Sequence, residues 1–377
     1  MPCFGDGTIY YSESRNRYVG QITLEIGGEK KRKTVYGKTQ KAVKDQLLEL
    51  RIQEKAGSFY EKDKTTLFQL GKQLIEEQFA LNEIRQTSYD RKYETLKAMN
   101  SIYDTAIQDV TERMIKLFFI SKINYSQSTI DKMFQLLKTI LNEAIKEKII
   151  TEHPMSAMKK PKSKKELVKV RALTIDEQKK LIDVLKNEDI LYSEQMLVSM
   201  FTGMRMGEVN ALMVDDIDFD DLTINVSKSV SRARSGKTEV CRTTKTKAGM
   251  RLLTINESVA DFLKECIGEK TDGLIFTSSN DKPITTNQVN YQYSNALKKF
   301  DIINKKVFGK VDLHSLRHTY ATRCIESGMP AKVLQKVLGH TDISITLDTY
   351  CDVFEKYSKK NLKIADKYMS ENDLAIG

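Results

Sequence analysis

The chain has 377 residues, which exceeds the usual size of one hydrophobic core and predicts two or three domains. Its residues are 40% hydrophobic and 30% charged, as in globular proteins, and no run of about 18 apolar residues predicts a membrane span. A net charge of +10 and a pI near 9.1 favour a polyanionic partner such as DNA or RNA, although many basic proteins bind neither.

Cysteine usage and the N-terminal residues bear on the compartment. The five cysteines are scattered and form neither a metal-binding knuckle nor a disulfide framework. Residues 1–20 lack the apolar segment of a signal peptide. We therefore expect a reduced, cytoplasmic protein without membrane association.

Residues 1–60 predict three β-strands followed by one helix. The strands are expected where β-branched and aromatic residues alternate with polar ones, at 8–11, 18–25 and 31–36. The helix runs from the expected N-cap Thr39 to about Lys55. A small sheet backed by one helix can lay its open face into a DNA major groove, although a basic module that docks on protein has the same pattern. The candidate DNA contacts are Arg15, Arg17, Lys31, Arg32 and Lys33.

Residues 64–158 predict an all-helical domain. Thr65 or Thr66 is the expected cap of a first helix through Phe79. Further helical periods cover roughly 87–98, 109–119 and 127–148, of which the last keeps its apolar residues three or four apart. Within this segment, nothing separates a DNA-binding bundle from a helical bundle without a ligand.

A basic linker follows at residues 159–171. Seven of its thirteen residues are Lys or Arg and only Glu166 is acidic, so it cannot bury a core and should be extended and exposed. Such a run is usually only solvated, but here it joins two candidate DNA-facing domains and could follow phosphates. The lysines proposed to do so are Lys159, Lys160, Lys162, Lys164 and Lys165.

From Ala172 onward the chain mixes helices and strands. A helix from about Ser193 to Thr202 should stop at Gly203, which places Arg205 in the break before the next helix. The other expected elements are a helix capped by Thr174 and Glu177, strands at 222–230, 238–243 and 250–255, and helices at 256–268 and 286–299. The acidic run 215–221 is interpreted as a solvated loop and not as a metal site.

Residues 312–350 concentrate chemically capable side chains. His314 and Arg317 are three apart on a predicted helix and share a face. A short amphipathic helix then ends at a glycine, so His340 lies at a helix-to-loop turn, and Tyr350 follows ten residues later. Histidines, an arginine and a tyrosine are suited to handling a phosphate.

Several sequence motifs follow one another in this half of the chain. They are Thr202-Gly203-Met204-Arg205-Met206-Gly207-Glu208, Thr244-Lys245-Thr246, His314-x-x-Arg317 and Leu338-Gly339-His340 with Tyr350 after it. Their types and order resemble the signature of the tyrosine recombinases, the phage-type integrases, over roughly residues 170 to 355. The chain departs from that pattern at Met204, at Ala248-Gly249 and at Thr254, and Lys247 stays a rival to Lys245.

The resemblance implies a multidomain α+β fold in several parts. It consists of a small three-stranded sheet with one helix as an arm-type DNA-binding domain at 1–60, a helical core-binding DNA domain at 64–158, the linker at 159–171, and a mainly α catalytic domain with a small β-sheet and a C-terminal tail at 172–377.

The resemblance also implies an activity and roles for individual residues. The enzyme would be a site-specific recombinase that integrates and excises a mobile element through a 3′-phosphotyrosyl intermediate. The implied roles are Tyr350 as nucleophile, Arg205 and Arg317 as phosphate clamps, His314 as acid/base helper, Lys245 as the acid for the departing 5′ oxygen, His340 as a phosphate hydrogen-bond donor and Glu208 as a support for His314 or an arginine. His318 is expected to pack or hydrogen-bond rather than react.

Partners and rivals complete the hypothesis. The expected partners are double-stranded DNA with core and arm sites, a homotetramer on that DNA, and accessory DNA-bending or excision factors in a bacterial cytoplasm. No cofactor or metal is expected, because the phosphotyrosyl ester stores the bond energy and no metal-binding or nucleotide-binding motif occurs. The alternatives are a nicking-closing enzyme resembling type IB topoisomerases and a non-catalytic DNA-binding regulator.

Overall fold

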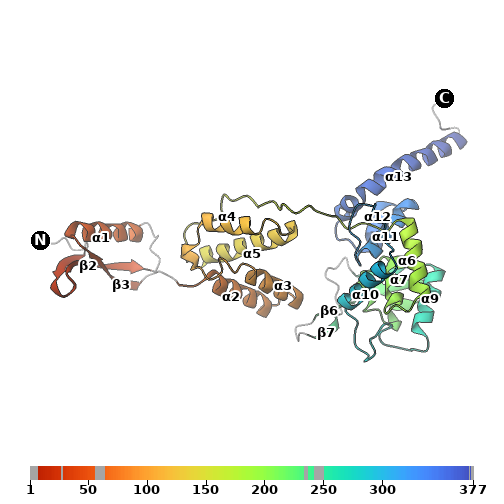
Figure 1. Ribbon diagram of the computed structural model, residues 1–377, viewed down its shortest axis with the longest axis horizontal. Coiled ribbons are helices and arrows are strands. Elements are labelled where there is room, and N and C mark those ends of the chain that lie inside the picture. Colours follow the sequence, from red (N-terminus) through yellow and green to blue (C-terminus); the bar gives the residue numbers. More distant parts are fainter. Residues whose placement is uncertain are drawn as a thin grey trace. The chain divides into compact units, whose positions relative to one another are not determined.

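The computed structural model describes residues 7–26, 29–55, 64–232, 237–241, 250–372 and 374. These residues divide into two compact units, one reaching to Leu167 and one beginning at Val168, apart from Arg85–Thr87, which group with the second. Figure 1 labels their helices and strands. Every helix in the described part of the chain is too short or too polar to cross a lipid bilayer.

The first unit begins with a three-stranded antiparallel sheet in the order β1-β2-β3. Its elements are β1 (Thr8–Ser12), β2 (Arg17–Ile26), β3 (Glu29–Gly37) and the helix α1 (Gln40–Lys55). Ile22 and Leu24 pack against Val43 and Leu47 of α1, which covers one face of the sheet. The predicted strands and helix are confirmed, and residues 27–28, between β2 and β3, lie outside the described residues.

The register of this sheet separates its basic residues between two faces. Ile22 and Leu24, which face α1, pair with Lys33 and Lys31, so these two lysines stand at the helix-covered face. Arg32 pairs with Thr23 on the opposite, open face. The five candidate DNA contacts of this sheet therefore do not all lie on one surface.

A helical bundle forms the rest of the first unit. It contains α2 (Leu67–Ala80), α3 (Gln86–Lys97), α4 (Glu112–Ser121) and α5 (Gln127–Lys146). The side chains of Thr66, Thr111 and Ser126 accept hydrogen bonds from first-turn backbone N–H groups, so α2, α4 and α5 begin where polar caps stand. The apolar positions of α5 lie in the core, which confirms the period seen in the sequence.

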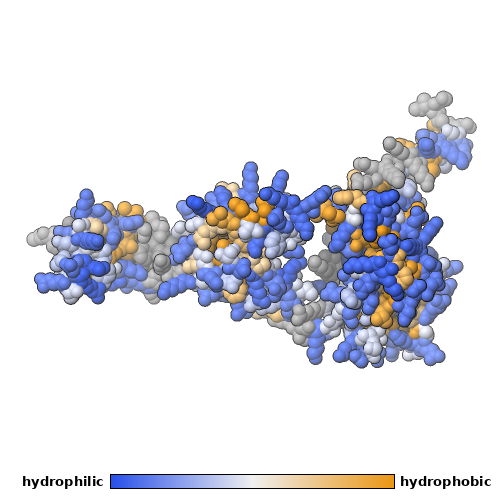
Figure 2. Space-filling model, in the orientation of Figure 1, coloured by the Kyte–Doolittle hydropathy of each residue, from blue (hydrophilic) through white to orange (hydrophobic). Residues whose placement is uncertain are grey.

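Most of the visible surface of this bundle is hydrophilic, with an apolar area over α4 in Figure 2. Leu117 and Ile120 of α4 are 57% and 62% exposed. Their neighbours Phe118 and Phe119 are buried, because successive side chains point to different sides of a helix.

The basic linker is attached to each unit by backbone contacts. Ser163 N–H donates to Gln127 Oε1 at 2.8 Å and Lys164 N–H to the Ile123 carbonyl at 2.8 Å, both within the first unit. Val170 pairs with Lys310 in the second unit. The expected exposure of the five linker lysines is confirmed, whereas the stretch around Ser163 lies on the bundle instead of running free.

The second unit is mainly helical and carries small antiparallel sheets. Its elements are α6 (Ile175–Asn187), α7 (Ser193–Thr202), α8 (Met206–Val209), β4 (Ile217–Asp218), β5 (Thr223–Val226), β6 (Ser229–Arg232), β7 (Thr238–Cys241), β8 (Arg251–Thr254), α9 (Glu257–Ile267), α10 (Thr286–Lys299), α11 (Ser315–Glu326), α12 (Ala331–Leu338) and α13 (Ile343–Glu371). One buried apolar core draws on α6, α7, α9, α10, β5 and β8. A smaller cluster joins α11 and α12 to Tyr350.

Two predictions about residues 215–230 need correction, although four aspartates of the acidic run, Asp215, Asp218, Asp220 and Asp221, are exposed as expected. The single strand expected at 222–230 is two strands in different sheets, since β5 pairs with β4 and β8 while β6 pairs with β7. Asp216, expected in a solvated loop, is 5% exposed, forms an ion pair with Lys228 and accepts the Met213 N–H. Lys228 lies at the break between β5 and β6, where its ammonium meets the buried Asp216.

Candidate active site

The break between α7 and α8 positions the first candidate arginine. Gly203 ends α7 with a left-handed φ of 68°, and a Cβ at this position would lie 2.5 Å from the Tyr320 ring. The next helix begins directly after Arg205. The Arg205 side chain is 42% exposed, so its guanidinium can reach a ligand from outside.

Glu208 holds this arginine from one helical turn further on. It is 4% exposed, and its carboxylate accepts the Arg205 backbone N–H at 3.0 Å and Nη1 at 2.9 Å. Arg251 of β8 donates to the same carboxylate at 2.9 Å. Burial by itself raises the pKa of Glu208, but Arg251 and Arg205 outweigh it and hold the pKa below its usual value. The carboxylate therefore stays charged at neutral pH.

Arg317 of α11 is the buried member of the cluster, at 2% exposed. Its Nη1 donates to the Gly203 carbonyl at 2.8 Å and its Nη2 to the Leu338 carbonyl at 2.5 Å. One guanidinium therefore joins the ends of α7 and α12, and it retains further N–H donors, since a guanidinium has five.

The charges in this cluster favour an anionic ligand. Burial, followed by the nearby Arg205, lowers the pKa of Arg317 to about 9. The charges of two neighbouring arginines, Arg205 and Arg251, lower the pKa of Arg317, and the carboxylate of Glu208 raises it. Three cations around one carboxylate leave positive charge that a phosphate would neutralise.

His340 follows the C-terminal glycine of α12 and lies beside the same arginines. Its Nδ1 is 2.8 Å from the hydroxyl of the fully buried Thr346. Burial, then Arg317 and Arg205, lower the pKa of His340 to about 4, so the ring is neutral at pH 7. In the tautomer that accepts the Thr346 hydroxyl at Nδ1, Nε2 carries the ring proton and can donate it in a hydrogen bond.

Tyr350 lies in a break within α13, where its own φ of −120° and ψ of 18° are not helical. Its side chain is 5% exposed and packs on the α11–α12 cluster. The hydroxyl lies 2.9 Å from His318 Nδ1. Burial raises the pKa of the phenol to about 12, although Arg317 opposes that rise.

The structure brings most of the predicted site residues together in the second unit. The pKa of Arg317 responds to Arg205, Glu208 and Tyr350, and that of His314 to Arg317 and Arg205. Lys245 and its rival Lys247 lie outside the described residues. The linker lysines and the basic residues of the N-terminal sheet belong to the first unit and are not part of this cluster.

From the sequence we expect His318 to pack or hydrogen-bond, which its contact with Tyr350 bears out, but the sequence assigns no role to Arg251 or Thr346. His318 lies four residues after His314, and the two rings meet edge to face with centroids 4.8 Å apart. Arg251 carried a weak signal, as a basic residue at the start of a predicted strand, and it is now seen bonded to Glu208 and to the Val337 carbonyl. Thr346 gave no signal, because its contact with His340 depends on the turn between α12 and α13.

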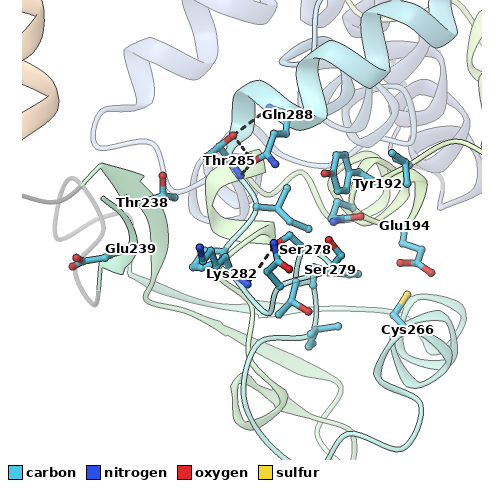
Figure 3. Close-up of a pocket in the computed structure, with 18 of the residues that line it drawn as sticks. Tyr192, Glu194, Thr238, Glu239, Cys266, Ser278, Ser279, Lys282, Thr285 and Gln288 are labelled. Carbon is cyan, nitrogen blue, oxygen red and sulfur yellow. Dashed lines mark hydrogen bonds between the residues drawn. The ribbon is translucent and has the colours of Figure 1, made fainter. Parts of the chain in front are cut away.

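Cavity volume alone does not locate this cluster. A cavity of about 1100 Å³ lies in the second unit beside the starts of α7 and α10, lined by residues such as Tyr192, Glu194, Thr238 and Lys282 (Figure 3). None of the candidate catalytic residues lines it. Among the described residues, no group of three or more His, Cys, Asp or Glu side chains could hold a metal ion.

Comparison with known families covers most of the chain. The phage integrase family profile matches residues 171–356, and the phage integrase SAM-like domain profile matches residues 66–164. A XerC-like tyrosine recombinase of Caldanaerobacter subterraneus is 25% identical over 93% of this chain and 95% of its own length. The transposase from transposon Tn916 of Enterococcus faecalis is 27% identical over 71% of this chain and 69% of its own length. The ICEBs1 integrase of Bacillus subtilis is 29% identical over 69% of this chain and 71% of its own length.

Solved structures with this fold include two integrases. The integrase of transposon Tn1549 in complex with a circular intermediate DNA has a TM-score of 0.67 at 20% identity, over 79% of this chain and 99% of that one. A lambda integrase dimer bound to a COC′ core site has a TM-score of 0.58 at 17% identity, over 92% of this chain and 95% of the integrase chain. The fold class predicted from the sequence is therefore confirmed. From the sequence matches over both units and the order of the motifs, we conclude that the chain belongs to the phage integrase family of tyrosine recombinases.

Proposed function

We propose that this protein is a site-specific DNA recombinase that cleaves and rejoins DNA through a covalent bond between Tyr350 and a 3′ phosphate, and so integrates and excises a mobile element. One observation carries the proposal. The buried hydroxyl of Tyr350 lies in the same cluster as Arg317 and Arg205, although the two arginines are over a hundred residues apart in sequence. Arg317 bonds to the Gly203 carbonyl at the end of α7, and Arg205, two residues later, is held by Glu208.

The arginines prepare the site for the charge of the reaction. A phosphodiester resists attack because its non-bridging oxygens are negative, and that charge grows at a five-coordinate phosphorus. Arg205 and Arg317 would donate to those oxygens, and His340 would donate from Nε2. Their own fixation by Glu208, Gly203 and Leu338 means that little reorganisation is needed when DNA arrives.

In the chemical step the Tyr350 oxygen bonds to phosphorus while the bond from phosphorus to the 5′ oxygen breaks. The 5′ oxygen takes a proton, for which Lys245 is the candidate donor, and leaves as a hydroxyl. The phosphotyrosyl ester keeps the energy of the broken bond, so a 5′ hydroxyl from another strand can reverse the step without a nucleotide cofactor.

Basic surfaces of the first unit would hold the DNA around this centre. The open face of the N-terminal sheet carries Arg17 and Arg32 beside exposed Tyr36, and Arg15 hydrogen-bonds to the Tyr36 hydroxyl at 2.6 Å. We assign the arm-site contacts to this face, whereas Lys31 and Lys33 stand at the helix-covered face. The exposed linker lysines would follow phosphates between the two units.

Assembly on DNA is the remaining part of the proposal. A lambda integrase tetramer bound to a Holliday junction shares this fold at a TM-score of 0.56. We infer a homotetramer for this chain in the bacterial cytoplasm, aided by accessory DNA-bending factors. Leu362, Ile364 and Tyr368 of α13 are each about 60% exposed and would pack on a neighbouring subunit.

A suicide substrate, in which a nick near the cleavage site lets the short 5′ fragment diffuse away, tests the function. The wild type should accumulate a covalent protein–DNA adduct and Tyr350→Phe should form none. Tyr293→Phe is the matched control, because Tyr293 is fully buried and its hydroxyl has no hydrogen-bond partner among the described residues. An adduct with Tyr350→Phe would contradict the nucleophile, and relaxation of plasmids lacking any site would favour a nicking-closing enzyme.

A further inference from the structure

The attacking phenol is hydrogen-bonded to a histidine to which the proposed function gives no role. His318 lies on α11, directly after Arg317, and its Nδ1 is 2.9 Å from the Tyr350 hydroxyl. The two rings meet edge to face, with centroids 5.7 Å apart and planes at 62°. In the described part of the chain, no hydrogen bond joins Tyr350 to His314, the histidine expected to assist it.

The direction of this hydrogen bond follows from the two groups. Burial, then His314 and Arg317, lower the pKa of His318 to about 4, while burial raises that of Tyr350 to about 12. Both groups are therefore neutral at pH 7. A neutral imidazole nitrogen is a much stronger base than a phenol oxygen, so the tyrosine O–H donates and Nδ1 accepts.

We propose that His318 accepts the Tyr350 proton during cleavage and returns it during rejoining, an assignment that rests on the proposed recombinase function. As the tyrosine oxygen bonds to phosphorus, its proton passes to His318 Nδ1, and the electrons of the breaking bond leave with the 5′ oxygen. In rejoining, the imidazolium returns this proton to the departing tyrosine oxygen. The proton for the 5′ oxygen comes from a different group, so the two transfers balance separately.

The charges around His318 make this transfer depend on bound DNA. The nearby charges of His314 and Arg317 disfavour the protonated form of His318, while Asp312, just before α11, favours it. A phosphodiester gripped by Arg205 and Arg317 adds negative charge that raises the basicity of His318. Without DNA the proton stays on the phenol, which keeps the nucleophile inactive.

His318→Asn separates proton transfer from positioning. An asparagine carbonyl can accept the same hydrogen bond from Tyr350 but cannot take a proton at neutral pH. We expect single-turnover cleavage of the suicide substrate to slow by about 100-fold or more, the range of general-base catalysis, with DNA binding unchanged. His153→Asn, which alters the histidine of the first unit, should cleave at the wild-type rate.

Rescue distinguishes a proton acceptor from a structural residue. Replacing Tyr350 by a fluorinated tyrosine that is already deprotonated at the assay pH removes the need for a base. In the His318→Asn background this replacement should restore cleavage to within about tenfold of the fluorinated parent, because proton transfer from the nucleophile no longer limits the rate. A 5′-thiol leaving group, which needs no protonation, should not rescue His318→Asn.

Three results would contradict the assignment. The first is cleavage by His318→Asn at the wild-type rate. The second is failure of the fluorinated tyrosine to restore the cleavage rate of His318→Asn. The third is rescue of His318→Asn by the 5′-thiol substrate, which would make His318 the acid that protonates the 5′ oxygen. In each case the wild type still forms the adduct, so the recombinase function stands. A wild type that forms no adduct contradicts the function itself and the assignment with it.

Discussion

Glu208 is the residue that keeps the arginines of the site in place. Its buried carboxylate bonds to Arg205 and to Arg251, and Arg251 in turn donates from Nε to the Val337 carbonyl at 2.7 Å. The carboxylate thereby connects α8, β8 and the last turn of α12, the helix that precedes His340.

Glu208→Gln should destabilise the fold and impair cleavage. The amide keeps the shape but leaves the buried Arg251 without its counter-charge, which lowers the free energy of unfolding by about 3 kcal/mol. Denaturant unfolding measures this loss. Glu94→Gln, which removes an exposed pair with Lys97, is the control and should change stability far less, because solvent screens an exposed pair. Equal effects of the two substitutions would contradict the role of Glu208.

Glu177 predicts a pH dependence of stability. Burial by itself raises its pKa, but two 2.7 Å hydrogen bonds from Arg171 and the backbone N–H groups of Thr174 and Asn304 lower it to about 2. Because the folded pKa is below the ordinary value of 4.5, the stabilisation is present above that value and is lost as the pH falls toward 2.

Urea unfolding between pH 7 and pH 3 measures this effect. The wild type should lose stability below about pH 4.5 more steeply than Glu177→Gln, which has no proton to bind at this position. Parallel curves for the two proteins would show that Glu177 does not titrate in this range.

At the residue scale, sequence reasoning found side chains whose chemistry is unusual and whose spacing is local. Arg205 next to a helix-ending glycine, and His314 with Arg317 on one turn, could be predicted because both depend on neighbours in sequence. The bond from His318 to Tyr350 could not, since it joins residues 32 apart on two different helices and nothing in the sequence names a partner for His318.

Among the elements, the α7–α8 break is the one that positions Arg205 and Arg317. Its geometry requires a residue with positive φ and no side chain, because a Cβ on Gly203 would overlap the Tyr320 ring.

Gly203→Ala should therefore reduce both stability and cleavage. Strain from the positive φ and the clash with Tyr320 should lower the free energy of unfolding by about 2 to 3 kcal/mol, and cleavage should fall more than DNA binding, because the Gly203 carbonyl holds Arg317. Gly273→Ala is the matched control, since Gly273 has a φ of 80° with nothing within 4 Å of an added Cβ. If both variants lose the same stability and keep cleavage, the close approach at Gly203 has no role in the site.

The elements themselves were predictable where one face is apolar. The strong period of α5 and the caps of α2 and α6 indicated helices near their observed bounds. The division of residues 222–230 into β5 and β6 was not predictable, because the two strands pair with different strands, β5 with β8 and β6 with β7. Local β-propensity contains no information about those partners.

For the whole molecule, the basic linker predicts how DNA binding responds to salt. Each lysine that neutralises a phosphate contributes about −0.9 to the slope of log K against log salt. Changing Lys159, Lys162, Lys164 and Lys165 to Gln should make the slope shallower by up to about 3.6 and weaken binding to all sequences alike.

The control changes four lysines of the same unit that already have carboxylate partners. Lys72, Lys97, Lys116 and Lys146 each lie within 3.7 Å of a glutamate oxygen, so their loss should leave the slope nearly unchanged. Equal slopes for the linker and control variants would show that the linker does not follow phosphates.

The identity of the residue joined to DNA tests the central claim most directly. Adduct trapped on a suicide substrate is digested with nuclease and trypsin, and the nucleotide-bearing peptide is sequenced by mass spectrometry. We expect the 3′-phosphonucleotide on the Tyr350 oxygen, with Arg205→Ala and Arg317→Ala each reducing the yield by at least about 100-fold. A nucleotide on any other residue, or full yield without both arginines, would contradict the account.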